Sequence, residues 1–190
     1  MIKIPPPLAD RLPEVQAFRD SLDLETDRGC AIIAASYVDD QLAEMLKAHF
    51  VESKRLIKEV FSGSGALSTF SARIDMSFLS GHISKAVQRE LHLIRGIRNK
   101  FAHAPHPLSF TEPAIEQQCR ALAYSHHPKS REPRAHFCSS ATAVLAFIHV
   151  SHHQAKRPSV RADLKPTEAH KEKVRKAARK RFATDRSKNI

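Results

Sequence analysis

The sequence predicts an all-α protein, a helical bundle followed by a basic C-terminal tail, and three observations carry this prediction. Only 5 of the 190 residues are Gly, which is less than half the number that average usage gives. No stretch alternates β-branched and polar residues as a half-buried strand does. Apolar residues recur instead at steps of three and four, the spacing of a helix that packs on one side. Hydrophobic residues make up 42% of the chain, enough to form a core.

Three helices are expected in the first third of the chain. A short helix covers residues 8–22 and has Pro13 in its first turn, where proline is tolerated. The central helix covers residues 25–50, because its apolar residues form one stripe: Ile32, Ile33, Val38, Leu42, Met45, Leu46 and Phe50. A brief third helix over residues 53–61 stops at the Ser-Gly-Ser-Gly run of residues 62–65.

The middle of the chain contains two further helices with recognisable ends. Ser68 or Thr69 is expected to cap the first of them, and Gly81 ends it. The second covers residues 84–103, because Pro105 disfavours helical geometry at the residue before it.

The last third of the chain closes the bundle and then changes character. Thr111 is expected to cap a short helix that has Pro113 in its first turn and continues to about Tyr124, and residues 125–135 form a polar loop. An apolar helix over residues 137–152 completes a domain that spans residues 8–153. Residues 154–190 form a basic tail, flexible or partly helical, because they include few apolar side chains that could dock.

Charge is distributed unevenly between these two parts. The formal net charge is +11, and residues 156–190 hold 13 Lys or Arg against 4 Asp or Glu. Such a segment suits the phosphate backbone of DNA or RNA, which it binds with strong salt dependence and little sequence preference. A solvated tail without a partner is the alternative. The expected nucleic-acid contacts are Lys171, Lys173, Arg175, Lys176, Arg179, Lys180 and Arg181.

Several features of the sequence narrow the class of protein. No apolar stretch is long enough to span a bilayer, and the first residues lack the apolar core of a signal peptide, so we expect a cytoplasmic protein without membrane contact. Cys30, Cys119 and Cys138 have no CxxC spacing and are expected as buried thiols. His149 and His153 lie one turn apart but lack the Cys or carboxylate partners of a metal site. We expect no cofactor and no metal.

One segment places titratable residues on an otherwise apolar helix. It is Arg95-Gly96-Ile97-Arg98-Asn99-Lys100-Phe101-Ala102-His103. Arg98 lies four residues after Ile94 and so borders the buried stripe, where a guanidinium needs a partner. The candidate partners are Glu90, Asp75, Glu25 or a bound phosphate.

The hexapeptide RNKFAH in this segment resembles the Arg-polar-x3-His signature of the HEPN superfamily, whose members are helical bundles, often dimers, and include metal-independent ribonucleases. The resemblance implies that His103 assists attack of a ribose 2′-hydroxyl on the adjacent phosphate, Arg98 stabilises the developing charge, and Asn99 orients the group. Residues five apart on a helix differ in direction by about 140°. Arg98 and His103 therefore converge only if the helix end unwinds or a second subunit faces the first, and we expect a homodimer.

A wider resemblance covers residues 25–119. Several segments in this range resemble the mannitol operon repressor (MltR) family. They are ETDR (25–28), VDDQL (38–42), TFSARI (69–74), ELHLIR (90–95) continuing to His103, and FTEP (110–113). That family is all-helical and includes regulators of sugar-alcohol operons, without an obvious helix-turn-helix. The resemblance implies a transcriptional regulator that acts through protein or nucleic-acid contacts.

The same blocks contain charged residues that could share one site. They are Glu25, Asp27, Arg28, Arg73 and Arg95, in addition to Arg98, Asn99 and His103. Three interpretations stay open: a structural network of ion pairs, a pocket for phosphate or another ligand, and a catalytic centre. Buried charge requires partners under all three.

Overall fold

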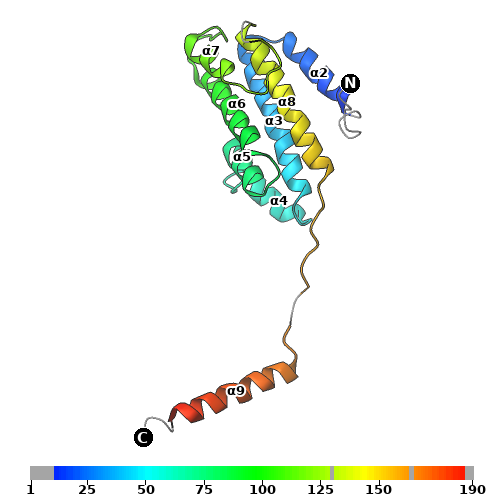
Figure 1. The fold of residues 1–190 in the computed structure, drawn as a ribbon, viewed down its shortest axis with the longest axis vertical. Coiled ribbons are helices and arrows are strands. Elements are labelled where there is room, and N and C mark those ends of the chain that lie inside the picture. Colours follow the sequence, from blue (N-terminus) through cyan, green and yellow to red (C-terminus); the bar gives the residue numbers. More distant parts are fainter. Residues whose placement is uncertain (1–10, 129–130, 163–164, 187–190) are drawn as a thin grey trace. The chain divides into compact units, whose positions relative to one another are not determined.

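The computed structural model of the chain describes residues 11–128, 131–162 and 165–186. All regular elements among these residues are helices, which confirms the predicted all-α class (Figure 1). The chain divides into two compact units, residues 1–158 and residues 159–190.

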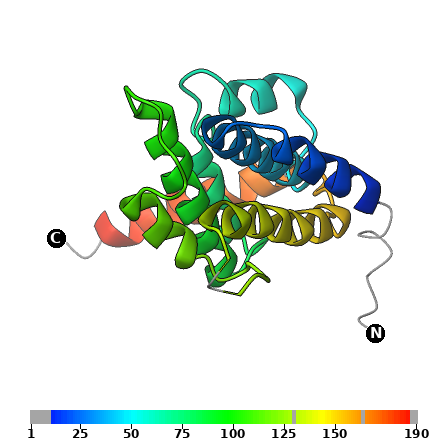
Figure 2. The same cartoon turned by 90° about the horizontal axis from the view of Figure 1, so that it is seen from above.

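The first unit is a bundle built around one long helix, α3. This helix packs against α5, α6 and α8, and α2 lies along both α3 and α8 (Figure 2). The helices of this unit are α2 (Leu12–Asp23), α3 (Asp27–Ala48), α4 (Lys54–Phe61), α5 (Phe70–Leu79), α6 (Lys85–His103), α7 (Pro113–Arg120) and α8 (Pro133–His153).

The helices begin and end largely where local chemistry predicts. Thr69 caps α5 by accepting the N–H of Ala72 at 3.2 Å, and Ser84 caps α6 in the same way. Ala104 is extended, with φ −67° and ψ 128°, because the following proline excludes helical geometry there. The prediction that this helix stops at His103 is therefore confirmed.

Three boundaries in the last third of the bundle were predicted wrongly: the start and the end of α7 and the start of α8. Glu112, not Thr111, precedes α7, and this helix ends at Arg120. The N–H groups of Ala123 and Tyr124 bond to a side chain of α6 instead of to carbonyls one turn back, so α7 does not continue. Helix α8 begins at Pro133 within the predicted loop, since proline at the first helical positions loses no hydrogen bond.

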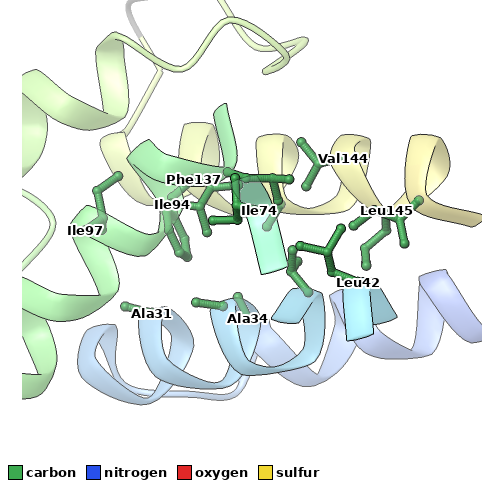
Figure 3. Close-up of a cluster of buried hydrophobic side chains, with 14 of the residues drawn as sticks. Ala31, Ala34, Leu42, Ile74, Ile94, Ile97, Phe137, Val144 and Leu145 are labelled. Atoms are coloured by element: carbon green, nitrogen blue, oxygen red, sulfur yellow. The ribbon is translucent and has the colours of Figure 1, made fainter. Parts of the chain in front are cut away.

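The core lies between α3, α5, α6 and α8. Ala31 and Ala34 of α3 point into the same cluster as Ile94 of α6 and Phe137 of α8 (Figure 3), and all four side chains are fully buried. Alanine side chains on α3 let the larger residues of its neighbours approach closely and fill the interior.

The second unit contains α9 (Glu168–Arg186). Every side chain described in this helix, from Glu168 to Arg179, is exposed. Good helix formers such as Ala, Lys and Arg account for its helical backbone without a packed face.

Candidate functional site

The RNKFAH segment forms the last turns of α6, which stays helical through His103. Arg98 is half-buried and donates to Oδ1 of Asn99 at 3.0 Å. The His103 side chain is exposed. Because α6 does not unwind, the side chains of Arg98 and His103 leave it in directions about 140° apart. A centre that uses both requires a second copy of the chain.

Arg28 of α3 binds the end of α6 beside this segment. Its Nη2 donates to the carbonyl oxygens of Ala102 at 3.0 Å and of Ala104 at 3.2 Å. The last carbonyls of a helix lack partners within the helix and carry partial negative charge. Arg28 therefore fixes the C-terminal end of α6 against α3 and places a guanidinium group on the two carbonyls that flank His103.

Asp27 joins three separate segments at the start of α3. Its carboxylate accepts from Nη1 of Arg134 at 2.9 Å, from the Ser109 hydroxyl at 2.9 Å and from the N–H of Phe110 at 3.0 Å. Arg134 also donates to the carbonyls of Leu22 and Glu25, at 2.7 and 2.6 Å. This Asp27–Arg134 network holds α8 and the segment after α6 against the start of α3.

The Glu25 side chain lies over the first turn of α3. A Cβ atom at Gly29 would meet its Oε2 at 2.3 Å, so a larger residue there would displace this carboxylate from its place over the helix. A negative charge at the N-terminal end of a helix is favourable.

Arg73 closes the loop between α4 and α5. It donates to Oδ1 of Asp39 at 2.7 Å and to three backbone carbonyls of the loop and its flanks: Phe61, Leu67 and Ser68. Burial raises the pKa of Asp39 above its usual range, and the Arg73 contact acts against this. All the donor groups that Arg73 directs inward are therefore occupied within the fold.

Three guanidinium groups near the end of α6 have no carboxylate partner among the described residues: Arg28, Arg95 and Arg98. We call them the arginine cluster. Nε of Arg95 is buried without a hydrogen-bond partner. The positive charge of Arg98 is a minor influence that opposes the raised pKa of Asp39, which is consistent with Arg98 lying on the side of α6 near α3. Guanidinium groups that lack carboxylates are suited to phosphate.

The carboxylates that were expected to pair with Arg98 bind elsewhere. Asp75 accepts from Gln88 at 2.7 Å and lies 2.9 Å from Nε2 of His92. Glu90 accepts the N–H groups of Ala123 and Tyr124, each at 3.0 Å, and the hydroxyl of Ser140. Arg98 therefore pairs with none of the three carboxylates named as candidates, and its hydrogen bond among the described residues goes to Asn99 at 3.0 Å.

This difference gives a testable contrast between two arginines. We expect Arg98→Ala to change the free energy of unfolding by less than about 0.5 kcal/mol, as at an ordinary surface position. We expect Arg134→Ala to lower it by about 2 kcal/mol, because the Asp27 carboxylate loses a charged partner. Urea denaturation of both variants measures the two effects, and equal losses would contradict the contrast.

Sequence reasoning missed Arg134 and assigned Glu90 the wrong partner. Arg134 falls in the predicted polar loop, and the signal that could have moved it into a helix is Pro133 directly after Glu132, an acidic residue before proline at a helix start. Nothing in the sequence near Glu90 indicates that its partners lie more than 30 residues away.

The bundle has a counterpart among solved structures. No protein-family model matches the chain, and no curated protein matches it. It superposes on a chain of the MtlR–HPr complex from Escherichia coli, MtlR being a mannitol operon repressor, with a TM-score of 0.61 and 16% sequence identity. The match covers 71% of this chain and 98% of that chain. This chain has the MtlR fold. At 16% identity the likeness establishes the fold alone. It supports the sequence resemblance to the mannitol operon repressor family at the level of the fold.

The basic residues of the tail belong to α9, outside the bundle. Lys171, Arg175 and Arg179 follow one another at four-residue steps and so share a side of the helix. Lys173 and Lys176 are exposed as well. Lys180 and Arg181 lie in α9, but their side chains are outside the described residues. Glu172 lies 4.0 Å from Arg175 and 3.8 Å from Lys176, which leaves a large excess of positive charge.

Two further features are not found in the part of the chain that the structure describes. None of the helices described in residues 11–186 is long and apolar enough to cross a membrane. Within the same part of the chain, no group of three or more His, Cys, Asp or Glu side chains is placed to hold a metal ion.

His149 gives the bundle a dependence on pH. It is 5% exposed, and Nε2 lies 3.2 Å from Oε1 of Gln41. Burial lowers its pKa below 6.5 in the folded chain. As the pH falls through 6.5, the unfolded chain binds a proton that the folded chain does not, so stability falls. We expect Tm to decrease from pH 7.5 to 5.5, and to decrease less in His149→Gln. The exposed His153→Gln is the control, and an unchanged pH profile in His149→Gln would contradict this assignment.

Proposed function

We propose that this chain is a transcriptional regulator that acts through contacts with a protein partner and with nucleic acid. The observation that carries the proposal is the MtlR fold, which matches over 98% of the MtlR chain. That chain was solved in complex with a protein, HPr. The bundle itself lacks the large positive excess of the tail, so we assign the protein contact to residues 1–158 and the nucleic-acid contact to residues 159–190.

Titration with Escherichia coli HPr tests the protein contact. We expect saturable binding by calorimetry, with the same Kd for the full chain and for residues 1–158. The shortened chain is a suitable comparison because it keeps the whole bundle and the ion pair of Arg157 with Glu52. No binding at about 1 mM, the weak end of measurable affinity, would remove HPr-type partners from the proposal. Binding that disappears with the tail would reverse the assignment.

A second candidate function is a metal-independent ribonuclease of the HEPN type, in a homodimer. The observation that favours it is the arginine cluster, which has no carboxylate partner among the described residues. One of its members, Arg28, donates to the carbonyls of Ala102 and Ala104, which flank the exposed His103. In this function His103 of one subunit moves the proton of the 2′-hydroxyl, and Arg98 of the other stabilises charge on the phosphate. The two subunits must then meet along the ends of their α6 helices.

Incubation of mixed RNA with the protein in EDTA tests the enzyme. We expect cleavage that is lost in His103→Ala and kept in His106→Ala, since His106 is a nearby exposed histidine outside the motif. Intact RNA with the wild-type protein at several pH values would reject the ribonuclease. That result would leave the regulator unaffected, because protein binding needs no cleavage.

A further inference from the structure

Two cysteines that are distant in the sequence meet inside the bundle. Sγ of Cys30 in α3 lies 3.3 Å from Sγ of Cys138 in α8, and both residues are buried. Cys119, the third cysteine, is buried too. Among the described residues its sulfur forms no hydrogen bond with another sulfur atom. The chain therefore contains one close thiol pair and one separate thiol that serves as an internal comparison.

The position of the pair is fixed by the Asp27–Arg134 network. Cys30 follows Asp27 by three residues and Cys138 follows Arg134 by four, so the ion pair lies one helical turn before the sulfurs on both helices. A disulfide has an S–S length of about 2.05 Å, so the sulfurs must approach by roughly a further 1.3 Å from their 3.3 Å separation. Side-chain rotation can supply a movement of this size.

The two thiols differ in a way that suits stepwise oxidation. Cys138 is 8% exposed, whereas Cys30 is fully buried, so a small oxidant reaches Cys138 first. The hydrogen bond with Cys30 lowers the pKa of Cys138, and the positive charge of Arg134 adds to this effect. The thiolate is the form of cysteine that attacks an oxidant.

We propose that Cys30 and Cys138 form a redox modification site, which a peroxide converts into an intramolecular disulfide. The Cys138 thiolate attacks one peroxide oxygen; the O–O bond breaks, an S–O bond forms, and hydroxide leaves and takes up a proton. The Cys30 sulfur then attacks the sulfenic sulfur of Cys138; the S–O bond breaks, the S–S bond forms, and the thiol proton leaves with the oxygen as water. Overall, two thiols are oxidised by two electrons and one hydrogen peroxide is reduced to two waters.

The disulfide would join α3 to α8 through a covalent bond beside Arg28, the residue that holds the end of α6. Oxidation would thereby fix the start of α3, which contains Arg28 of the arginine cluster. The proposal depends on the thiol geometry alone and stands whether the chain is a regulator or a ribonuclease.

Counting of thiols in the oxidised full-length protein tests the proposal. The protein is treated with hydrogen peroxide, unfolded and labelled with N-ethylmaleimide. Mass spectrometry of the intact chain then gives the number of labels per chain. We expect one label per chain after oxidation and three before it, because the sequence has three cysteines. Peptide mapping should find Cys30 linked to Cys138, and dithiothreitol should restore three labels.

Cys119→Ser is the matched variant, since it removes the separate thiol and leaves the pair intact. It should carry two labels before oxidation and none after it. Three labels on the oxidised wild type, a link that includes Cys119, a link between chains, or a sulfinic acid on Cys138 without a bridge would each overturn the proposal. None of these readouts requires a variant of Cys30 or Cys138, so they do not depend on whether such a variant folds.

Discussion

Replacing Glu90 by alanine is expected to lower the free energy of unfolding by about 3 kcal/mol. Glu90 is 2% exposed and accepts three hydrogen bonds, two from the backbone beyond α7 and one from Ser140 of α8. Its loss leaves the N–H groups of Ala123 and Tyr124 without their acceptor and frees the segment between α7 and α8 from α6. Urea denaturation and Tm both measure this loss.

Two further variants make the Glu90 result specific. Glu59→Ala removes a carboxylate from an exposed pair with Arg55, and we expect a change of less than about 0.5 kcal/mol. Glu90→Gln keeps the size of the side chain but points an amide donor at one of the groups that donate to Glu90, so its loss of stability should be intermediate. A loss of less than about 1 kcal/mol in Glu90→Ala, the net value of one ordinary hydrogen bond, would show that the carboxylate does not hold these segments together.

Removal of residues 159–190 is expected to abolish most of the affinity for DNA and RNA. This segment holds 11 Lys or Arg against 4 Asp or Glu. If the full chain neutralises about six phosphates, the logarithm of its binding constant should fall against the logarithm of salt concentration with a slope of about −5. The shortened chain should give a slope nearer zero. Fluorescence anisotropy with two duplexes of unrelated sequence, between 50 and 200 mM salt, measures the slope and the sequence preference.

A variant of the intact chain separates charge from length. Substitution of Lys171, Lys173, Arg175 and Lys176 by glutamine keeps good helix formers in α9 and removes four positive charges. It should reproduce most of the change in slope. An unchanged slope in both chains would place any nucleic-acid contact on the bundle instead, and a strong preference between the duplexes would contradict a contact made with phosphates alone.

The helices themselves could be predicted because their signals are local. The apolar stripe of α3 and the proline after α6 each act within a few residues, and the structure places these two helices close to the predicted bounds. One member of the predicted stripe is wrong: Ile33 is 40% exposed, because the buried face of α3 at this turn is formed by Ala31, Ala34 and Ala35. The end of α7 could not be predicted, since it depends on hydrogen bonds to Glu90, more than 30 residues earlier. The start of α8 was missed because polar residues there were interpreted as a loop, although proline is common at helix starts.

The sequence could predict which charged residues belong to the candidate site, but not which partner each of them binds. The sequence marks Arg73, Arg95 and Arg98 as charged residues beside apolar stripes, and nothing in it distinguishes them. In the structure Arg73 is occupied by Asp39 and three carbonyls, whereas Arg95 and Arg98 have no carboxylate partner among the described residues. The difference arises from which helices pack together, and a helical pattern does not specify that.

The unbroken course of α6 through His103 also determines how each function would respond to dilution. Chemistry that needs both Arg98 and His103 would belong to a pair of chains, so the activity of each chain would fall once the concentration drops below the dissociation constant of that pair. Recognition of another protein by one bundle would be independent of such association. Because α6 is continuous, ribonuclease activity per chain would depend on protein concentration, whereas binding of a protein partner by one bundle would not.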